Sequence, residues 1–140
     1  MPEPLRVFLD ANILSSASFE PNHPFLRFWL EPGIVCLTSF YAADEVRRNA
    51  RRVGHQERLE VLLEKTHLVS DAAHFRMPAH FGLPGKDQPI LAAAIQCGAD
   101  FLITGDKAHF GKWMNLAIPT PVGELMTMLP KPFLQLLEGG

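Results

Sequence analysis

The 140-residue sequence has little of several features that mark other classes of protein. It contains two cysteines, Cys36 and Cys97, and no CxxC motif, so it predicts neither a disulfide framework nor a cysteine-ligated structural metal. No apolar run approaches the roughly 18–20 residues of a membrane span, and Glu3 precedes any apolar stretch at the N-terminus. We therefore expect a soluble, cytoplasmic protein without a membrane partner.

An excess of charge of one sign is also lacking, because 13 Lys and Arg residues stand against 15 Asp and Glu residues. The formal net charge of −2 excludes a protein whose whole surface is basic and binds nucleic acid everywhere. Hydrophobic residues make up 47% of the chain, which is enough for the core of one domain of roughly 100–200 residues. We expect a single domain over residues 1–140, with its core at about 5–128 and a C-terminal arm at 129–140.

Short apolar runs alternate with helical patterns along the chain. The runs at residues 5–9, 34–37 and 101–104 predict buried strands. Helices are expected to begin near Pro24, after Ser39 and at Asp87, where capping residues or proline precede apolar periodicity. The alternation predicts an α/β fold, a three-layer α/β/α sandwich around a central, mainly parallel sheet.

Other segments give more specific expectations. Asn12 is expected to cap the first helix, and the helix after Ser39 is expected to run through Arg52 until Gly54. A further helix is expected at about 56–65, followed by a long surface loop at 68–86. After the third predicted strand we expect a short helix through Trp113, an edge strand at 116–118 and a helix at 121–129. A weak helix or an interaction arm is expected after Pro130.

Four acidic residues are expected to meet at one edge of this sheet. Asp10 and Asp106 follow two of the predicted strands, and ligands of parallel α/β sheets bind beyond the carboxyl ends of the strands. Asp87 begins a helix that starts at the same edge, and Glu45 lies in the second turn of the helix capped by Ser39. The pattern therefore predicts a cluster of four carboxylates.

Carboxylates gathered in this way raise one another's pKa unless a cation lies among them. Oxygen ligands without histidine or cysteine favour Mg²⁺ or Mn²⁺ over zinc. Such an ion activates water and stabilises the charge that develops on a phosphodiester during displacement. We therefore expect a site for Mg²⁺ or Mn²⁺, with the metal ligands and catalytic residues Asp10, Glu45, Asp87 and Asp106.

Each acid also has a structural interpretation when it is taken alone. Asp10 and Asp106 could be turn residues, and Asp87 could be the N-cap of its helix. Glu45 could be a solvated residue paired with Asn49 or an arginine. Helical spacing does not choose between Glu45 and its neighbour Asp44.

Basic residues lie close to the second acid in the sequence. Arg47, Arg48, Arg51 and Arg52 are expected to form one stripe on the helix of Glu45. The alternative is a solvated face, whereas beside a metal site guanidinium groups are suited to binding a phosphate backbone. Further basic residues that could extend this surface are Arg6, Lys86, Lys107 and Lys112, and the histidines expected at the surface or in loops are His23, His55, His67, His74 and His80.

Four segments resemble, in order, the four acidic motifs of the PIN domain. They are VFLDAN at 7–12, DEVRR at 44–48, DQPILAAA at 87–94 and ADFLITGDK at 99–107. The resemblance covers about residues 5–128 and is greatest to the prokaryotic branch that includes the toxin nucleases of VapBC toxin–antitoxin pairs. It implies an α/β/α sandwich, Mg²⁺- or Mn²⁺-dependent cleavage of RNA, and frequently a homodimer inhibited by a small antitoxin.

By position, the resemblance assigns the metal-binding carboxylates to Asp10, Glu45, Asp87 and Asp106, and so favours Glu45 over Asp44. Asn12 and Thr104 match polar residues that support these acids in the family. Many members carry a further acid after the Thr-x-Asp motif, and in this sequence His109 stands at about that position. Asp100 resembles a frequent family residue but precedes its strand, so it is expected at the opposite end of the sheet with a structural role.

The sequence thus favours a metal-dependent endoribonuclease that acts on RNA. The resemblance further implies that it is the toxin of a toxin–antitoxin pair, with a small antitoxin and a second copy of the chain as partners. The alternative is a nucleic-acid or protein-binding module with weak or no catalysis, which His109 and the lack of an obvious general base suggest. A phosphatase of the haloacid dehalogenase type is disfavoured, because that family needs an Asp two residues after Asp10, where Asn12 stands.

Overall fold

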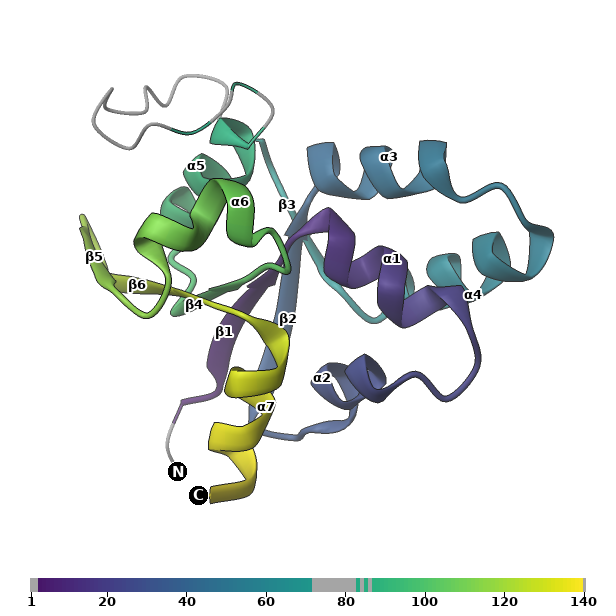
Figure 1. The fold of residues 1–140 in the computed structure, drawn as a ribbon, viewed down its shortest axis with the longest axis horizontal. Helices are drawn as coiled ribbons and strands as arrows, with labels where there is room; N and C mark the ends of the chain where they lie inside the picture. Colours follow the sequence, from purple (N-terminus) through teal and green to yellow (C-terminus); the bar gives the residue numbers. More distant parts are fainter. Residues whose placement is uncertain (1–2, 72–82, 84, 86, 140) are drawn as a thin grey trace.

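The computed structural model describes residues 3–71, 83, 85 and 87–139, and these form a mixed sheet with helices on both of its faces (Figure 1). The strand order is β3-β2-β1-β4-β6-β5, and every neighbouring pair is parallel except β5 and β6. The strands are β1 (Leu5–Leu9), β2 (Ile34–Ser39), β3 (His67–Val69), β4 (Phe101–Ile103), β5 (Ala117–Thr120) and β6 (Gly123–Met128). The expected α/β fold with a mainly parallel central sheet is therefore confirmed.

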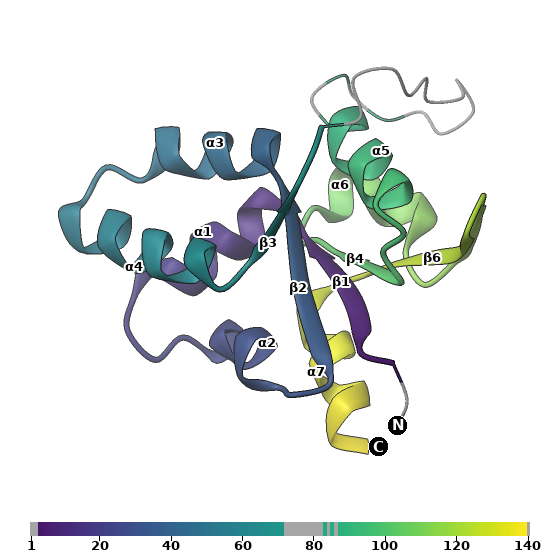
Figure 2. The same cartoon turned by 180° about the vertical axis from the view of Figure 1, so that it is seen from behind.

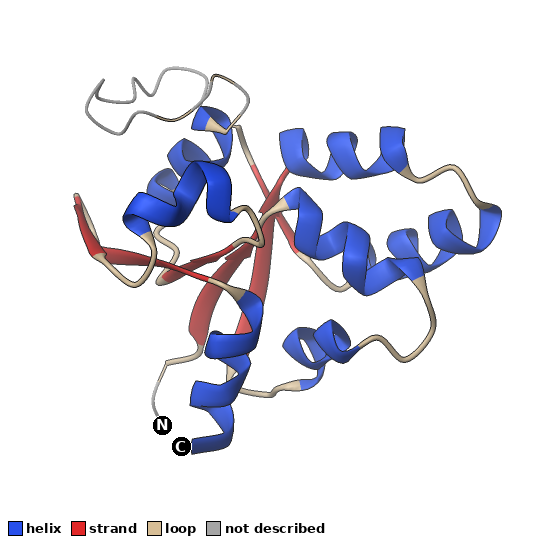
Figure 3. Ribbon diagram, in the orientation of Figure 1, coloured by secondary structure: helices blue, strands red, loops and turns tan. Residues whose placement is uncertain are grey.

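Two groups of helices cover the sheet. The α-helices are α1 (Ala11–Phe19), α2 (Arg27–Leu30), α3 (Phe40–Asn49), α4 (Val53–Glu64), α5 (Gln88–Gln96), α6 (Lys107–Phe110) and α7 (Pro130–Gly139), and the 3-10 helices are η1 (Pro24–Leu26) and η3 (Gly111–Trp113). Helices α1 to α4 lie on one side of the strands, and α5 and α6 lie on the other (Figures 1 and 3).

The strand order explains this division. The chain moves outward from β1 through β2 to β3 and then returns past β1 to β4. Connections between parallel strands are right-handed, so the direction in which the next strand is added to the sheet decides which face the connecting helix covers. When that direction reverses, the connecting helices cover the opposite face. The reversal makes the carboxyl ends of β1 and β4 a topological switch point, the place where ligands bind in open α/β sheets.

The central strand and α5 hold the middle of the core. Val7, Phe8 and Leu9 of β1 are fully buried, as is typical of a parallel strand covered on both faces. Residues 90–95 of α5 are all buried, and Gly98 ends this helix with φ +73°, a left-handed conformation that glycine adopts without steric cost. The sequence signals for β1 and for the end of α5 are thus confirmed.

The C-terminal residues form a helix that packs on the fold. Phe133 of α7 is 1% exposed, stacks on Phe28 of α2 at 5.7 Å between ring centroids, and meets Phe101 of β4 edge-on at 5.0 Å. Arg27 also forms an ion pair with Glu138 at 2.7 Å. Both views show α7 close to the N-terminal end of the chain (Figures 1 and 2).

The expected helix at 121–129 and the expected loop at 68–86 are wrong where these segments form strands. Residues 123–128 form strand β6 instead of a helix, because this segment pairs with β4 and buries Leu125 and Thr127 at alternate positions. Residues 67–69 belong to β3, which pairs with β2, and the rest of the expected loop at 72–82, 84 and 86 lies outside the described residues. The edge strand expected at 116–118 is β5.

The helix expected from Ser39 to Gly54 is in fact two helices. Helix α3 ends at Asn49, and α4 begins at Val53 with Gly54 inside it. The Gln56 side-chain amide donates a hydrogen bond of 2.8 Å to the Ala50 carbonyl, which would be bonded to a backbone N–H if α3 continued. His55 is also buried, within 2.9 Å of the Ser18 hydroxyl, and the expectation that it lies at the surface is wrong.

Candidate metal centre

Asp10 is buried at the point where β1 passes into α1. Its side chain caps α1, because Oδ1 accepts the Ala11 N–H at 2.6 Å. Its other oxygen, Oδ2, accepts the Thr104 hydroxyl at 2.8 Å and the Asn12 side-chain amide at 3.3 Å. Asp10 is therefore the helix cap that Asn12 was expected to be, and three donors hold its carboxylate in one orientation.

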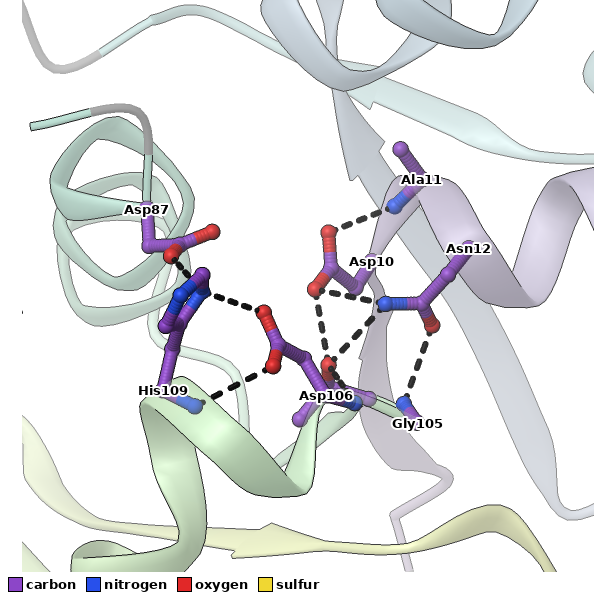
Figure 4. A network of polar contacts seen from close by, with 8 residues as sticks. Asp10, Ala11, Asn12, Asp87, Gly105, Asp106 and His109 are labelled. Atoms are coloured by element: carbon purple, nitrogen blue, oxygen red, sulfur yellow. Dashed lines mark hydrogen bonds and ion pairs between the residues drawn. The ribbon is translucent and has the colours of Figure 1, made fainter. Parts of the chain in front are cut away.

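Asn12 and Thr104 connect the end of β1 to the turn after β4. The Asn12 Oδ1 atom accepts the Gly105 N–H at 2.9 Å, and the Thr104 hydroxyl oxygen accepts the Asp106 N–H at 3.1 Å. Asn12 also donates to Thr104 Oγ1 at 3.3 Å. Both residues thus contact Asp10 and the turn that carries Asp106. Figure 4 shows Asn12 between Asp10 and Gly105.

Asp87 and Asp106 meet at His109, a residue of α6. The His109 Nδ1 atom lies 2.6 Å from Asp87 Oδ2 and 2.7 Å from Asp106 Oδ2. Asp106 also caps α6, since its Oδ1 atom accepts the His109 N–H at 3.1 Å. Asp87 is the N-cap residue of α5, as its structural interpretation expected, but its side chain makes no capping hydrogen bond to the described helix.

Glu45 completes the convergence of the four predicted acids. A cavity of about 320 Å³ is lined by Asp10, Ala11, Asn12, Ser15, Glu45, Val46, Asn49, Asp87 and Asp106. The acids reach it from four different parts of the fold: the end of β1, helix α3, the start of α5 and the turn after β4. Asp44, the neighbour that competed with Glu45, instead lines a separate cavity with Tyr41 and Asp71.

Sequence reasoning missed two polar residues that line this cavity and one contact of His109. Ser15 and Asn49 line the cavity, and their signal was helical spacing, since they follow Asn12 and Glu45 by about one turn. His109 was placed near the acids by its position after Asp106, but its contact with Asp87 was not predicted, because that contact depends on how α5 and α6 sit together.

The acids influence one another electrostatically. The pKa of Asp10 is raised from 3.8 to about 6, mainly by burial and in smaller part by the nearby charges of Asp87 and Glu45, against the opposing effect of hydrogen bonds from Thr104 and Ala11. A carboxylate in this position is stabilised by a bound cation. The expected mutual repulsion of the cluster is thus seen at Asp10.

The donor atoms fit a divalent cation. One ligand atom each from Asp87, Asp106 and His109 lies within 4.8 Å of the other two, and Asp10 and Glu45 line the same cavity. Carboxylate oxygens are the preferred ligands of Mg²⁺ and Mn²⁺, and an imidazole nitrogen adds a ligand that suits transition metals. The structure thus places one imidazole nitrogen beside two of the carboxylates that the sequence predicted.

The predicted arginine stripe is broken. Arg51 and Arg52 follow the end of α3, and the Arg52 guanidinium lies 5.9 Å from the centre of the Phe19 ring. Arg47 pairs with Glu60 of α4 at 3.0 Å, whereas Arg48 stays on α3 with its Nε 3.3 Å from the Asp44 carbonyl. The four arginines do not share one helix, because α3 ends before the last two.

The other basic residues occupy different regions. Lys107 begins α6 directly after Asp106, and the Lys112 ammonium lies 5.5 Å from the centre of the Trp113 ring. Arg6 is at the opposite end of the sheet, where its guanidinium donates to the Cys97 and Gly98 carbonyls and its N–H donates to Asp100 at 2.9 Å. Asp100 therefore lies away from the acids, as expected, and Lys86 lies outside the described residues.

Comparison with known proteins identifies the family. Among the described helices, none has the length and apolar character needed to cross a membrane. No curated protein matches the sequence. The fold resembles a chain in the crystal structure of VapBC2 from Rickettsia felis bound to a DNA fragment from their promoter, with a TM-score of 0.61, 15% identity, and coverage of 88% of this chain and 98% of that chain. The family model described as the PIN domain matches residues 6–108, so the chain belongs to the PIN domain family.

Proposed function

We propose that the protein is an endoribonuclease that uses Mg²⁺ or Mn²⁺ to hydrolyse phosphodiester bonds of RNA. The observation that carries this proposal is the convergence of Asp10, Glu45, Asp87 and Asp106 on one cavity at the switch point of the sheet. Membership of a family whose members are generally nucleases supports the same reaction class. A pocket rich in carboxylates cannot bind phosphate alone, because like charges repel, so the substrate requires the cation.

The residues of the cavity divide into holding and positioning groups. Asp10, Asp87 and Asp106 would hold the ion, and Glu45, which lines the same cavity, would complete the site and orient a water molecule by accepting a hydrogen bond from it. When bound, the ion supplies Lewis-acid activation of water and stabilises the charge on the phosphate. Asn12 and Thr104 fix the Asp10 carboxylate through the hydrogen bonds that link β1 to the turn after β4.

The RNA backbone requires cationic partners outside the acidic cavity. Lys107 directly follows Asp106, and Arg48 lies three residues after Glu45 on α3. Arg47, Arg51 and Arg52 would extend the basic surface along α3 and the start of α4. Guanidinium groups bind phosphate through paired donors, so these residues would position the backbone while the acids hold the ion.

A cleavage assay with matched variants tests the proposal. Purified protein is incubated with labelled single-stranded RNA, with and without Mn²⁺, and wild type is compared with Asp10→Asn and Asp100→Asn. We expect metal-dependent cleavage that Asp10→Asn abolishes and that Asp100→Asn retains, because Asp100 bonds Arg6 at the far end of the sheet. Equal cleavage by wild type and Asp10→Asn would disprove the catalytic assignment.

A second candidate function is binding of nucleic acid or protein without catalysis. The observation that favours it is that the His109 imidazole contacts both Asp87 and Asp106, two of the proposed metal ligands. Calorimetry separates the candidates. Retained RNA binding with no uptake of Mg²⁺ or Mn²⁺ would support the binding module, whereas stoichiometric metal uptake would support the nuclease.

We also propose that the chain is the toxin of a toxin–antitoxin pair in the cytoplasm, with a small antitoxin as its partner and a homodimer as its assembly. The fold resemblance to a chain of the VapBC2 complex supports this proposal. So does an apolar cleft of about 420 Å³ between α1 and α4, whose lining includes Leu26, Val61 and Leu62. Co-purification with the product of an adjacent small open reading frame, and loss of RNA cleavage in that complex, would support it. Light scattering would report the homodimer.

A further inference from the structure

The His109 side chain is held between two of the acids. Its backbone N–H donates to Asp106 Oδ1 at 3.1 Å, while Nδ1 of its ring lies 2.7 Å from Asp106 Oδ2. The same Nδ1 atom lies 2.6 Å from Asp87 Oδ2 (Figure 4). Asp106 thus fixes the first turn of α6 and also contacts the ring of His109 in that turn.

The three facing atoms have the chemistry of a mixed ligand set. A neutral imidazole offers a nitrogen lone pair, and each carboxylate offers an oxygen, all within 4.8 Å of one another. Ligand atoms about 2.1 Å from one ion lie roughly 3–4 Å apart, so the separations of 2.6 and 2.7 Å between Nδ1 and the two carboxylate oxygens need to widen by only a few tenths of an ångström to admit an ion. Imidazole is a ligand for transition metals, whereas Mg²⁺ takes oxygen ligands.

We propose that His109, through Nδ1, is a ligand of the metal together with Asp87 and Asp106, and that this nitrogen makes the site select Mn²⁺ over Mg²⁺. The inference rests on the proposed function in that it concerns the same metal site. The opposing interpretation is that the ring occupies the place of the cation and leaves when an ion binds. The two interpretations predict opposite effects of removing the ring.

Electron paramagnetic resonance on the metal-loaded protein distinguishes them without measuring activity. The titrated wild type is expected to show the hyperfine coupling of a ¹⁴N nucleus bound to Mn²⁺, and His109→Ala to lose that coupling and bind Mn²⁺ about 10–100-fold more weakly. His109→Asp is expected to keep metal binding without the nitrogen coupling, and to lower the ratio of Mn²⁺ to Mg²⁺ affinity by about tenfold. His67→Ala, which changes an exposed histidine of β3, serves as the matched control.

The measurements also separate this inference from the proposed function. Mn²⁺ bound to wild type without ¹⁴N coupling, or Mn²⁺ bound as tightly or more tightly by His109→Ala, would overturn the inference while leaving the nuclease proposal intact. Nitrogen coupling in a protein that does not cleave RNA would support the inference and disprove the nuclease. The wild-type spectrum needs no substitution, so a variant that fails to fold does not remove the test.

Discussion

Opposing effects act on the carboxyl group of Asp10. Three hydrogen bonds favour its charged form, while burial and the charges of Asp87 and Glu45 favour the neutral form. Burial and the neighbouring charges outweigh the hydrogen bonds, so the pKa of Asp10 rises to about 6. At neutral pH the metal-free protein therefore holds a buried negative charge that costs free energy, and a bound cation would relieve this cost.

The first prediction concerns the pH dependence of stability in the metal-free protein. The folded-state pKa of Asp10, about 6, exceeds its ordinary value of 3.8, so the stabilisation from its proton is fully present below the ordinary pKa and is lost as the pH rises toward 6. We expect the free energy of unfolding of wild type to fall by up to roughly 3 kcal/mol more than that of Asp10→Asn between pH 4 and pH 7. Urea unfolding with a chelator present measures this difference, and parallel pH profiles for the two proteins would contradict it.

The second prediction compares two buried threonines, Thr104 directly after β4 and Thr127 in the neighbouring strand β6. The Thr104 hydroxyl bonds Asp10, Asn12 and Asp106, whereas the buried Thr127 hydroxyl has no hydrogen-bond partner in the described part of the chain. We expect Thr104→Val to lower the free energy of unfolding by about 1–3 kcal/mol, because it leaves buried polar groups unpaired. Thr127→Val is expected to be neutral or stabilising, since it removes an unpaired hydroxyl.

Urea unfolding of both variants in the presence of a chelator provides the measurement. The same loss of stability in the two variants would mean that the volume and shape of valine, and not the hydrogen bonds of Thr104, determine the effect. A larger loss in Thr104→Val assigns the difference to the polar network around Asp10.

At the scale of residues, the sequence predicted where the acids lie better than what they contact. Asp10 and Asp106 follow strand ends, and the rule that ligands bind at the carboxyl edge needs only that information. The contact of Asp87 with His109 joins the start of α5 to the middle of α6, and no local pattern encodes the distance between those helices. For the same reason, only the structure shows that the Asp87 side chain, at the N-cap position of α5, makes no capping hydrogen bond.

The break between α3 and α4 changes which arginines can serve the site. Arg47 faces α4, where its pair with Glu60 lowers the pKa of that carboxyl group. Both side chains are about half exposed, so this pair contributes at most about 1 kcal/mol to stability. Arg48 lies three residues after Glu45, and residues three apart on a helix are neighbours on its surface.

The third prediction follows from this difference between neighbours. The Asp10→Asn background allows binding to be measured without cleavage. In it we expect Arg48→Gln to weaken binding of single-stranded RNA several-fold. We also expect the slope of log K against log salt concentration to become shallower by about one, because one phosphate contact is lost. Arg47→Gln is expected to have a smaller effect, because Glu60 already engages its guanidinium group. Fluorescence anisotropy at several salt concentrations measures both. A larger loss in Arg47→Gln would contradict the assignment.

Elements whose sequence is a continuous apolar run were predicted correctly, whereas segments whose apolar pattern suits either a helix or a strand were not. Residues 5–9 and 101–103 are near-continuous apolar runs, as buried parallel strands are. Residues 121–129 begin with proline and contain Leu125, Met126 and Met128, a pattern that suits a helix or a strand. The segment forms a strand because it pairs with β4, whose residues are more than 20 positions away in the sequence.

At the scale of the whole molecule, the order of the strands accounts for the site and the charge distribution together. The switch point between β1 and β4 brings the acids to one cavity, while Arg6 and Asp100 lie at the far end of these two strands. A net charge of −2 thus conceals a local excess of negative charge beside cationic groups. The charge balance excludes binding of RNA over the whole surface, and it agrees with binding at one metal-dependent site.

The C-terminal segment was the part of the molecule whose contacts the sequence predicted least, since its prolines suggested an arm. Because Phe133 of α7 packs between Phe28 and Phe101, we expect Phe133→Ala to lower the free energy of unfolding by about 3–5 kcal/mol. Leu136→Ala, on the same helix with a side chain 58% exposed, is expected to change it by less than about 1 kcal/mol. Urea unfolding measures both variants. Equal, small effects would show that α7 is detached in solution and that the sheet and its other helices fold without it.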